Sequence, residues 1–190
     1  MKIILASASP RRKEILEMLG VKDMRIIPAV GEEQPPRGAG PADTVIALAL
    51  AKAREVACQA AEDETVIAAD TIVWHEGRIL GKPRSREEAA AMLASLSGNT
   101  HTVYTGVAVI SGGREISGAE ETSVSFRPLT AEEIESYIST GEPMDKAGAY
   151  GAQGRASVFV QGIRGDFFNV MGLPVCLLDG MLKKLGMSLA

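Results

Sequence analysis

Two long strand-forming segments joined by a glycine pair constrain the fold of this chain more than any other feature. Residues 101–111 and 114–126 are predicted to be strands, and only Gly112 and Gly113 separate them. A Gly-Gly doublet suits the positive φ angles of a two-residue hairpin turn. Strands joined by so short a turn run antiparallel. The sheet therefore has an antiparallel part, and a purely parallel sheet is not expected.

Helical segments alternate with strands along the rest of the chain. A helix at 10–19 is expected to begin with Ser9 as N-cap and Pro10 at its first position, with Gly20 just past its end. The segments 85–96 and 130–139 open with capping-box spacing, Ser85 with Glu88 and Thr130 with Glu133. This alternation predicts the α/β class, with a mixed sheet flanked by helices. The remaining predictions are helices at 42–61 and 174–185, strands at 2–6 and 65–69, and hairpins of 72–74 with 78–80 and of 157–163 with 166–171.

Composition narrows the class of protein. The 190 residues suit one domain covering 1–190, and the net charge of −4 disfavours a nucleic-acid partner. Cys58 and Cys176 are far apart and form no CxxC motif, so neither a disulfide framework nor a zinc site is expected. The first apolar run, residues 3–6, is too short for a signal peptide, and no later stretch reaches about 18 apolar residues. We therefore expect a cytoplasmic protein without a membrane partner.

The first candidate site is the turn between the strand 2–6 and the helix 10–19. Arg11 and Arg12 lie in the first turn of that helix, where the helix dipole is already positive. Such a placement is favourable when an anion binds, because backbone N–H groups, two guanidinium groups and the Ser7 and Ser9 hydroxyls can then converge on a phosphate. The alternative is a solvated pair of arginines with Ser9 as a simple cap.

The second candidate site is Asp70, followed by Thr71. Asp70 comes directly after the apolar segment 65–69, and we expect it at the carboxyl end of that strand. Ligands of open α/β sheets bind at this end of the strands. An aspartate there can hold a metal ion or accept a proton from water. A structural N-cap or turn aspartate is the alternative.

Two loops carry further candidates. Lys82, within Gly81-Lys82-Pro83, can neutralise a phosphate, although a loop lysine is commonly only solvated. Residues 145–155 contain three closely spaced glycines together with Gln153 and Arg155. Glycines allow a ligand to approach the backbone, and the Gln153 amide can both donate to and accept from a base edge. A flexible connector is the alternative interpretation of this loop.

A third loop, 31–41, contains Glu32 and Glu33. Together with Asp70, Glu33 could complete a Mg²⁺ site, since this ion prefers a few carboxylates plus substrate phosphates. A solvated acidic pair is the alternative. The two histidines, His75 and His101, have no ligand spacing, and no GxxxxGK[ST] phosphate loop is present.

Several of these motifs occur in the order found in one known family. The chain resembles the Maf family, and the motifs carrying the resemblance are Ser7-Ala8-Ser9-Pro10-Arg11-Arg12, Ala69-Asp70-Thr71, Gly81-Lys82-Pro83, Leu96-Ser97-Gly98 with His101, the segment 145–154 and Gly172-Leu173-Pro174. The resemblance implies a fold related to inosine triphosphatases. It also implies a nucleoside triphosphate pyrophosphatase that cleaves between the α- and β-phosphates, uses Mg²⁺ or a similar ion such as Mn²⁺ or Co²⁺, and removes unwanted nucleotides.

The same resemblance implies residue roles. Asp70 corresponds to the family's proposed proton acceptor, and we expect Asp70 and Lys82 to be catalytic. Arg11, Thr71 and Gln153 match the branch that prefers dTTP and UTP, rather than the branch that prefers 7-methyl-GTP. The phosphate-binding residues expected are Ser7, Ser9, Arg11, Arg12, Lys52 and Arg155, and the metal ligands expected are Asp70 and Glu33.

Other functions stay open at this point. The same reaction on 7-methyl-GTP or another modified nucleotide is one, and a nucleotide-binding regulator of cell division and septum formation is another. An intact Asp70, Lys82 and arginine set favours the enzyme, since a pure binder has no need of a base. A homodimer is also expected.

Overall fold

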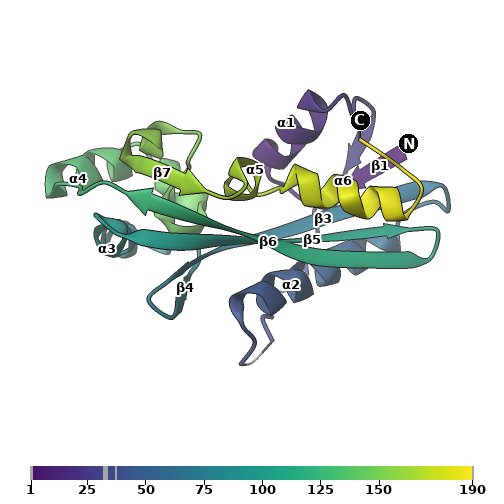
Figure 1. Ribbon diagram of the computed structural model, residues 1–190, viewed down its shortest axis with the longest axis horizontal. Helices are drawn as coiled ribbons and strands as arrows, with labels where there is room; N and C mark the ends of the chain where they lie inside the picture. The colour runs from purple at the N-terminus through teal and green to yellow at the C-terminus, as the bar shows by residue number, and fades with distance from the viewer. Residues whose placement is uncertain (1, 32–33, 37, 190) are drawn as a thin grey trace. The chain divides into compact units, whose positions relative to one another are not determined.

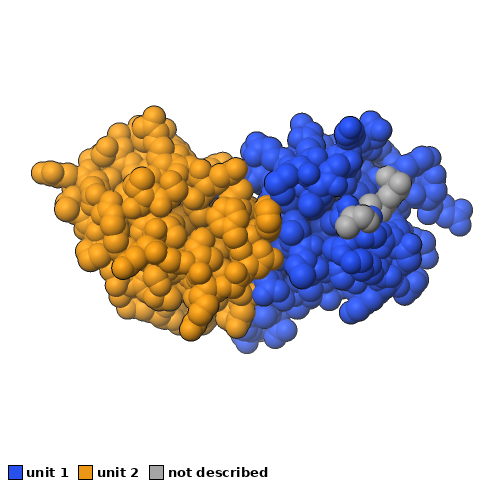
Figure 2. All heavy atoms as spheres, turned by 45° about the horizontal axis from the view of Figure 1, so that its top comes forward, with its two compact units in different colours: residues 1–70, 105–120, 172–190 blue, residues 71–104, 121–171 orange. Residues whose placement is uncertain are grey.

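The computed structural model describes residues 2–31, 34–36 and 38–189, and it divides the chain into two compact units (Figure 2). Unit 1 comprises residues 1–70, 105–120 and 172–190, and unit 2 comprises 71–104 and 121–171. The strands β3 (Glu64–His75), β5 (Thr100–Ser111) and β6 (Arg114–Phe126) each contribute residues to both units. The strand order is β2-β1-β3-β5-β6-β7, with β4 beside β3.

Parallel pairing characterises the first strands of unit 1. Strand β1 (Lys2–Leu5) pairs in parallel with β2 (Met24–Ile26) and with β3, and Leu5 is the partner of both Ile26 and Ile67. Antiparallel pairing of β3 with β4 (Arg78–Leu80) and of β6 with β7 (Val160–Arg164) makes the sheet mixed. The prediction of a mixed α/β sheet is therefore confirmed.

Helices cover both faces of the strands of unit 1. In Figure 1, α2 (Pro41–Ala57) lies on one face, and α1 (Pro10–Met18) and α6 (Val175–Lys184) lie on the other. The alanine-rich face of α2 permits a close approach to the sheet, most closely at Gly106 of β5, where a Cβ atom would lie 2.2 Å from the Val45 carbonyl oxygen. The core on this side contains Ile4, Ala6, Ala49, Ala53, Val56, Val66, Ala68 and Ala108.

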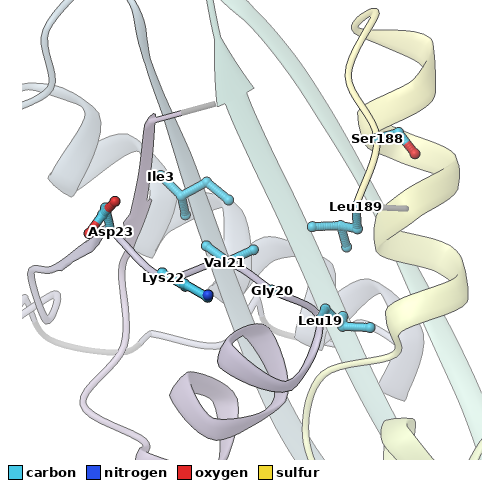
Figure 3. A pocket seen from close by; sticks show the side chains of 8 residues that line it. All are labelled: Ile3, Leu19, Gly20, Val21, Lys22, Asp23, Ser188 and Leu189. Atoms are coloured by element: carbon cyan, nitrogen blue, oxygen red, sulfur yellow. The ribbon is translucent and has the colours of Figure 1, made fainter.

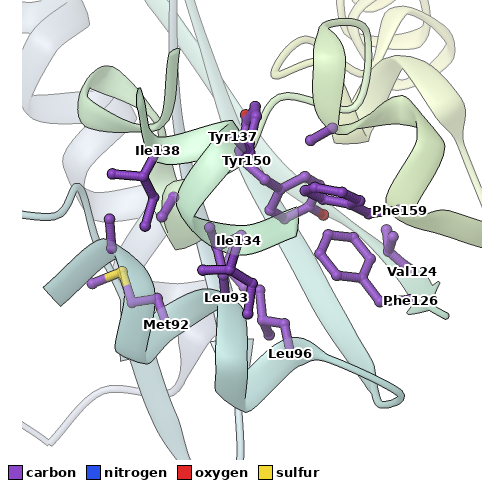
Figure 4. Close-up of a cluster of buried hydrophobic side chains, with 14 of the residues drawn as sticks. Met92, Leu93, Leu96, Val124, Phe126, Ile134, Tyr137, Ile138, Tyr150 and Phe159 are labelled. Carbon is purple, nitrogen blue, oxygen red and sulfur yellow. The ribbon is translucent and has the colours of Figure 1, made fainter. Parts of the chain in front are cut away.

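Unit 2 has its own core, which lies between the strand residues of this unit and two helices. These helices are α3 (Arg86–Leu96) and α4 (Ala131–Ser139), and α4 begins with a complete capping box formed by Thr130 and Glu133. Figure 4 shows aromatic rings of four residues packed among aliphatic side chains of α3 and α4, the rings being those of Phe126, Tyr137, Tyr150 and Phe159. Three 3₁₀ turns, Glu142–Asp145, Ala147–Ala149 and Arg155–Phe159, and the short helix α5 (Phe167–Val170) complete this unit.

Two of the expected elements are wrong. The strand expected at 65–69 does not end before Asp70, because β3 runs without interruption from Glu64 to His75 and contains the aspartate. The hairpin expected between 157–163 and 166–171 does not form. Its first segment begins as a 3₁₀ turn and continues as β7, which pairs with β6 instead, and its second is helical because the Asp166 carboxylate caps the Phe168 N–H at 2.7 Å.

The other expected elements are confirmed within a few residues at their ends. Helix α2 ends at Ala57, earlier than residue 61, and Met24–Ile26 is a strand that had not been predicted. At α3 the Ser85 hydroxyl accepts from the Glu88 N–H, whereas the Glu88 carboxylate accepts from Arg84 instead of closing the capping box. None of the described helices combines the length and the apolar character needed to cross a membrane.

His101 is buried in the core of unit 2, with 2% of its surface exposed. Its Nε2 atom lies 2.7 Å from the Tyr150 hydroxyl oxygen, and its ring packs edge-on against Phe126. Burial, with a smaller contribution from the charge of His75, lowers the pKa of His101 from 6.5 to about 3. The imidazole is therefore neutral in the folded protein near neutral pH.

This burial predicts a pH dependence of stability. Between pH 6.5 and about 3 the unfolded chain binds a proton at His101 that the folded protein does not bind. The free energy of unfolding therefore falls as the pH falls through this window, with a slope of at most about 1.4 kcal/mol per pH unit from this residue. Urea unfolding across the window is expected to show a smaller slope for His101→Gln than for the wild type. Equal slopes would contradict the assignment.

Candidate functional site

The turn that follows β1 is braced by Arg12. Its Nη1 atom donates to the Ser7 hydroxyl at 3.0 Å, and its Nε atom donates to the Gly172 carbonyl at 2.8 Å. The Ser9 N–H also donates to the Ser7 hydroxyl, at 3.2 Å, so the buried Ser7 side chain is the centre of the turn. Arg12 thereby joins the N-terminus of α1 to the segment preceding α6.

The N-terminus of α1 has the electrostatics expected of an anion site. Arg11 and Arg12 are both half-buried, and the described first turn of the helix has no acidic residue. Ser9 is at the N-cap position, but among the described residues its side chain makes no capping hydrogen bond. The N-cap position predicted for Ser9 is therefore confirmed, but its side chain does not cap the helix. The positive end of the helix dipole, the guanidinium groups of Arg11 and Arg12, and the hydroxyl groups of Ser7 and Ser9 are thus all found at the N-terminus of α1. These are the groups that bind anions at helix N-termini.

Asp70 and Lys52 form a nearly buried ion pair in unit 1. The Lys52 ammonium lies 2.5 Å from Asp70 Oδ1, and the two side chains are 18% and 10% exposed. Asp70 continues the alternation of Val66 and Ala68 along β3, so its side chain points to the face that α2 covers. An ion pair withdrawn from water in this way loses favourable hydration, so stability alone gives little reason for it, and such pairs occur often at functional sites.

The Asp70 pair and the Ser7 turn lie at the same edge of the parallel strands. Leu5 of β1 is the partner of Ile67, and the Ala6 N–H donates to the Ile67 carbonyl. Strand β3 continues past this point to Asp70, while the chain after β1 turns at Ser7 into α1. Asp70 is therefore located beside the carboxyl end of β1, and not at the end of its own strand, where it was expected.

A divalent ion is compatible with this donor set. Within the described residues no group of three or more His, Cys, Asp or Glu side chains could hold a metal ion. Mg²⁺ commonly needs only one or two carboxylates, with water and substrate phosphates completing its octahedron, and Asp70 supplies one carboxylate. Glu32 and Glu33 lie outside the described residues.

In unit 2 the structure joins two of the predicted loops. The Gly148 N–H donates to the Gly81 carbonyl at 3.0 Å, so the Gly81-Lys82-Pro83 loop and the loop 145–155 are neighbours. Gly148 has a φ of +67°, and a Cβ atom there would lie 2.8 Å from the side chain of Val73. Glycine is required here both for the backbone conformation and for the close packing.

The predicted site residues are thus distributed over both units. Ser7, Ser9, Arg11, Arg12, Lys52 and Asp70 belong to unit 1, whereas Thr71, Lys82, Gln153 and Arg155 belong to unit 2. Lys82, Gln153 and Arg155 are exposed, and Thr71 is half-buried.

Two partners of these residues lie outside every predicted motif. They are the side chains of Tyr137 and Glu142, which contact the loop 151–155. No local sequence signal marks them, because each acts on a residue more than ten positions further along the chain. The Gly172 carbonyl, which accepts from Arg12, belongs to the Gly172-Leu173-Pro174 motif, but the motif does not indicate this contact.

A cavity of about 360 Å³ in unit 1 lies elsewhere (Figure 3). It opens between the residues that connect α1 to β2, such as Val21 and Asp23, the start of β1 at Ile3, and the C-terminal Ser188 and Leu189. This is the opposite end of β1 from the Ser7 turn, and none of the predicted site residues lines it. This cavity is therefore separate from the polar residues clustered around Ser7 and Asp70.

The fold and these residue clusters define a mixed α/β protein. Its basic residues gather where β1 leads into α1, at an edge of the sheet that also carries Asp70. Residues 2–185 match the family model described as Maf-like protein, and the chain belongs to the Maf family. The dTTP/UTP pyrophosphatase of Moorella thermoacetica is 53% identical to it over 98% of this chain and 96% of that protein. The dTTP/UTP pyrophosphatase of Bacillus anthracis is 51% identical over 96% of this chain and 95% of that protein.

A solved structure agrees at the level of the fold. The Ham1 protein of Staphylococcus aureus matches 97% of this chain and 100% of that chain, with a TM-score of 0.51 and 13% sequence identity. At so low a sequence identity the match is informative only about the fold. It confirms the expected mixed α/β architecture.

Proposed function

We propose that this chain hydrolyses nucleoside triphosphates between the α- and β-phosphates, with a preference for dTTP and UTP, and releases the monophosphate and pyrophosphate. The Asp70–Lys52 pair beside the Ser7 turn is the observation that carries the proposal. It supplies a carboxylate and a cation at a helix end suited to anions. Relatives more than half identical over nearly the whole chain, named dTTP/UTP pyrophosphatases, support the same reaction and substrates.

Phosphate binding is assigned to the basic and hydroxyl groups that the sequence motifs indicated. Arg12 holds the Ser7 turn in shape. Arg11 and Arg12, with the hydroxyls of Ser7 and Ser9, contact the phosphate oxygens. Lys52, Lys82 and Arg155 add positive charge along the triphosphate. Sites of this kind act mainly by positioning the substrate and neutralising its charge.

Asp70 is assigned the role of general base. Its carboxylate orients and deprotonates the water that attacks the phosphate chain, while the ammonium of Lys52 balances its charge. Asp70, with Glu33, would hold a divalent ion, Mg²⁺ or else Mn²⁺ or Co²⁺. When bound, such an ion supplies charge neutralisation and a bound water of lowered pKa.

Base selectivity is assigned to Arg11, Thr71 and Gln153. The Gln153 amide and the Thr71 hydroxyl provide donors and acceptors that match O2, N3 and O4 of a pyrimidine. The enzyme works as one functional domain over residues 1–190, in the cytoplasm, as a homodimer, and without nucleic-acid or membrane partners. Two exposed free cysteines, Cys58 and Cys176, fit a reducing compartment.

A panel of nucleotides tests the selectivity. Initial rates are measured with the purified chain, Mg²⁺ and dTTP, UTP, CTP, GTP or 7-methyl-GTP. We expect kcat/KM for dTTP and UTP to exceed the other values by about tenfold or more, as site-specific hydrogen bonds allow. Turnover confined to 7-methyl-GTP would keep the reaction and refute the base assignment, while no turnover with any divalent ion would favour a nucleotide-binding regulator.

A further inference from the structure

The loop that carries Gln153 is held at both ends by two side chains that no motif predicted. The Tyr137 hydroxyl accepts from the Gly151 N–H at 3.2 Å and donates to Glu142 Oε1 at 3.0 Å. The other carboxylate oxygen of Glu142 accepts from the Arg155 N–H at 3.1 Å. One phenol and one carboxylate therefore bind the backbone on both sides of Gln153.

The backbone of the loop 151–155 approaches the same carboxylate closely at Gly154. A Cβ atom at this position would lie 2.0 Å from Glu142 Oε1 and 2.6 Å from its Cδ atom. The φ of Gly154 is −91°, which any residue can adopt. A side chain at position 154 would therefore displace the Glu142 carboxylate, and glycine leaves room for the contact between this carboxylate and the loop backbone.

Tyr137 and Glu142 are held in place by α4 and by the turn that follows it. Tyr137 is 4% exposed on α4, and its ring packs edge-on against Phe159 at a centroid distance of 5.3 Å. Glu142 follows α4 by one short turn, where its N–H donates to the Thr140 hydroxyl. Tyr137 belongs to the core of unit 2 (Figure 4), so the packing of this unit fixes its position without a ligand.

We propose that Tyr137 and Glu142 are positioning residues for base selection, and that they preorganise the loop 151–155 before the nucleotide arrives. This inference rests on the proposed function, in which Gln153 contacts the base. A loop already held in place loses less conformational entropy on binding, so its hydrogen bonds with the base give more net affinity and discrimination. The exposed Gln153 side chain is then presented from a fixed backbone.

Substitution of the two holding residues tests the proposal. In Glu142→Ala and in Tyr137→Phe we expect KM for dTTP to rise about tenfold and the preference for dTTP over CTP to fall by a similar factor. We expect kcat to change less than about threefold, and inhibition by pyrophosphate to weaken less than KM rises, because Arg155 is the only assigned phosphate-binding residue in this loop. Glu142→Gln, which retains one acceptor oxygen, is expected to recover part of the selectivity.

Glu132→Ala is the matched control, since this glutamate is exposed in the first turn of α4 and lies on the same helix as Tyr137. It is expected to leave KM and selectivity unchanged. Amide hydrogen exchange over 151–155 gives a second measurement that needs no activity, and Glu142→Ala should accelerate it by about tenfold or more.

The possible failures are distinguishable. A wild-type chain without nucleotide turnover would overturn the proposed function, and base selection by this loop with it, even if exchange showed the loop to be held by Glu142. Normal turnover with unchanged KM and selectivity in both variants would overturn the positioning role alone. Unchanged amide exchange in a folded Glu142→Ala protein would also overturn it.

Discussion

Asp70→Asn is expected to lower kcat for dTTP by about 10²- to 10⁴-fold, the range typical for loss of a general base. Asparagine has nearly the same shape but cannot accept the proton, and it also removes the negative charge that Lys52 contacts at 2.5 Å. The fold should survive, because the substituted side chain remains able to accept a hydrogen bond from the ammonium. Steady-state kinetics together with circular dichroism check both parts of this expectation.

Asp63→Asn provides the matched control. Asp63 is also paired with a lysine, Lys2, at 2.6 Å, but both side chains are more than half exposed. Exposed pairs of this kind contribute little to stability, about 0–1 kcal/mol, so this variant should retain the kcat of the wild type. A folded Asp70→Asn enzyme with unchanged turnover would refute the assignment of the base.

The second large effect is expected at Gly106, and it concerns stability. In Gly106→Ala the new methyl group would meet the backbone of α2, at 2.2 Å from the Val45 carbonyl oxygen and 2.7 Å from the Ile46 nitrogen. Backbone atoms cannot move aside as the end of a side chain can, so α2 must shift from the sheet. We expect a loss of about 3 kcal/mol in the free energy of unfolding, at the upper end for overpacked cores. For a chain of this length this corresponds to roughly 6–12 °C in Tm.

Gly162→Ala isolates the steric cause. Gly162 is also a strand glycine, in β7, but no neighbouring atom lies within 4 Å of a Cβ placed there. Its replacement should change Tm little, since surface substitutions typically stay within about 0.5 kcal/mol. Gly106→Ala should in addition lower activity, because α2 carries Lys52. Equal Tm values for the two variants would show that α2 does not pack on β5 as described.

The elements that could be predicted from the sequence are those whose ends are marked by turn or capping residues. The Gly112-Gly113 turn, the capping residues Thr130 and Glu133, and Pro10 at the start of α1 each act locally, and each was confirmed. The prediction of a strand end before Asp70 is wrong, because a charged residue within an apolar run does not end a strand when its charge is compensated. In the structure Asp70 stays within β3, since Lys52 on α2 compensates its charge.

The other errors have similar physical causes. The segment 157–171 has the alternation of a hairpin, but its first strand pairs with β6, and its second becomes a helix after the Asp166 cap. The three-residue strand β2 is largely exposed and carries no apolar pattern of its own. Pairing partners that are distant along the chain decide both outcomes.

The sequence indicated candidate residues of the site one by one. It did not indicate which of them contact each other in the folded protein. Motifs indicated Ser7, Arg12 and Asp70, whereas the bond from Arg12 to the Gly172 carbonyl joins positions 160 residues apart. In the same way, nothing in the spacing of the loop 145–155 indicates that Tyr137 and Glu142 hold it. These contacts depend on tertiary packing, which a single sequence does not encode locally.

Phosphorus NMR of dTTP hydrolysis by the purified chain with Mg²⁺ tests the central claim most directly, because it identifies the bond that is broken. We predict that dTMP and pyrophosphate appear together in equal amounts from the first spectra, and that both signals grow far more slowly with Asp70→Asn. Early accumulation of dTDP and inorganic phosphate would show cleavage between the β- and γ-phosphates and would contradict the proposed reaction.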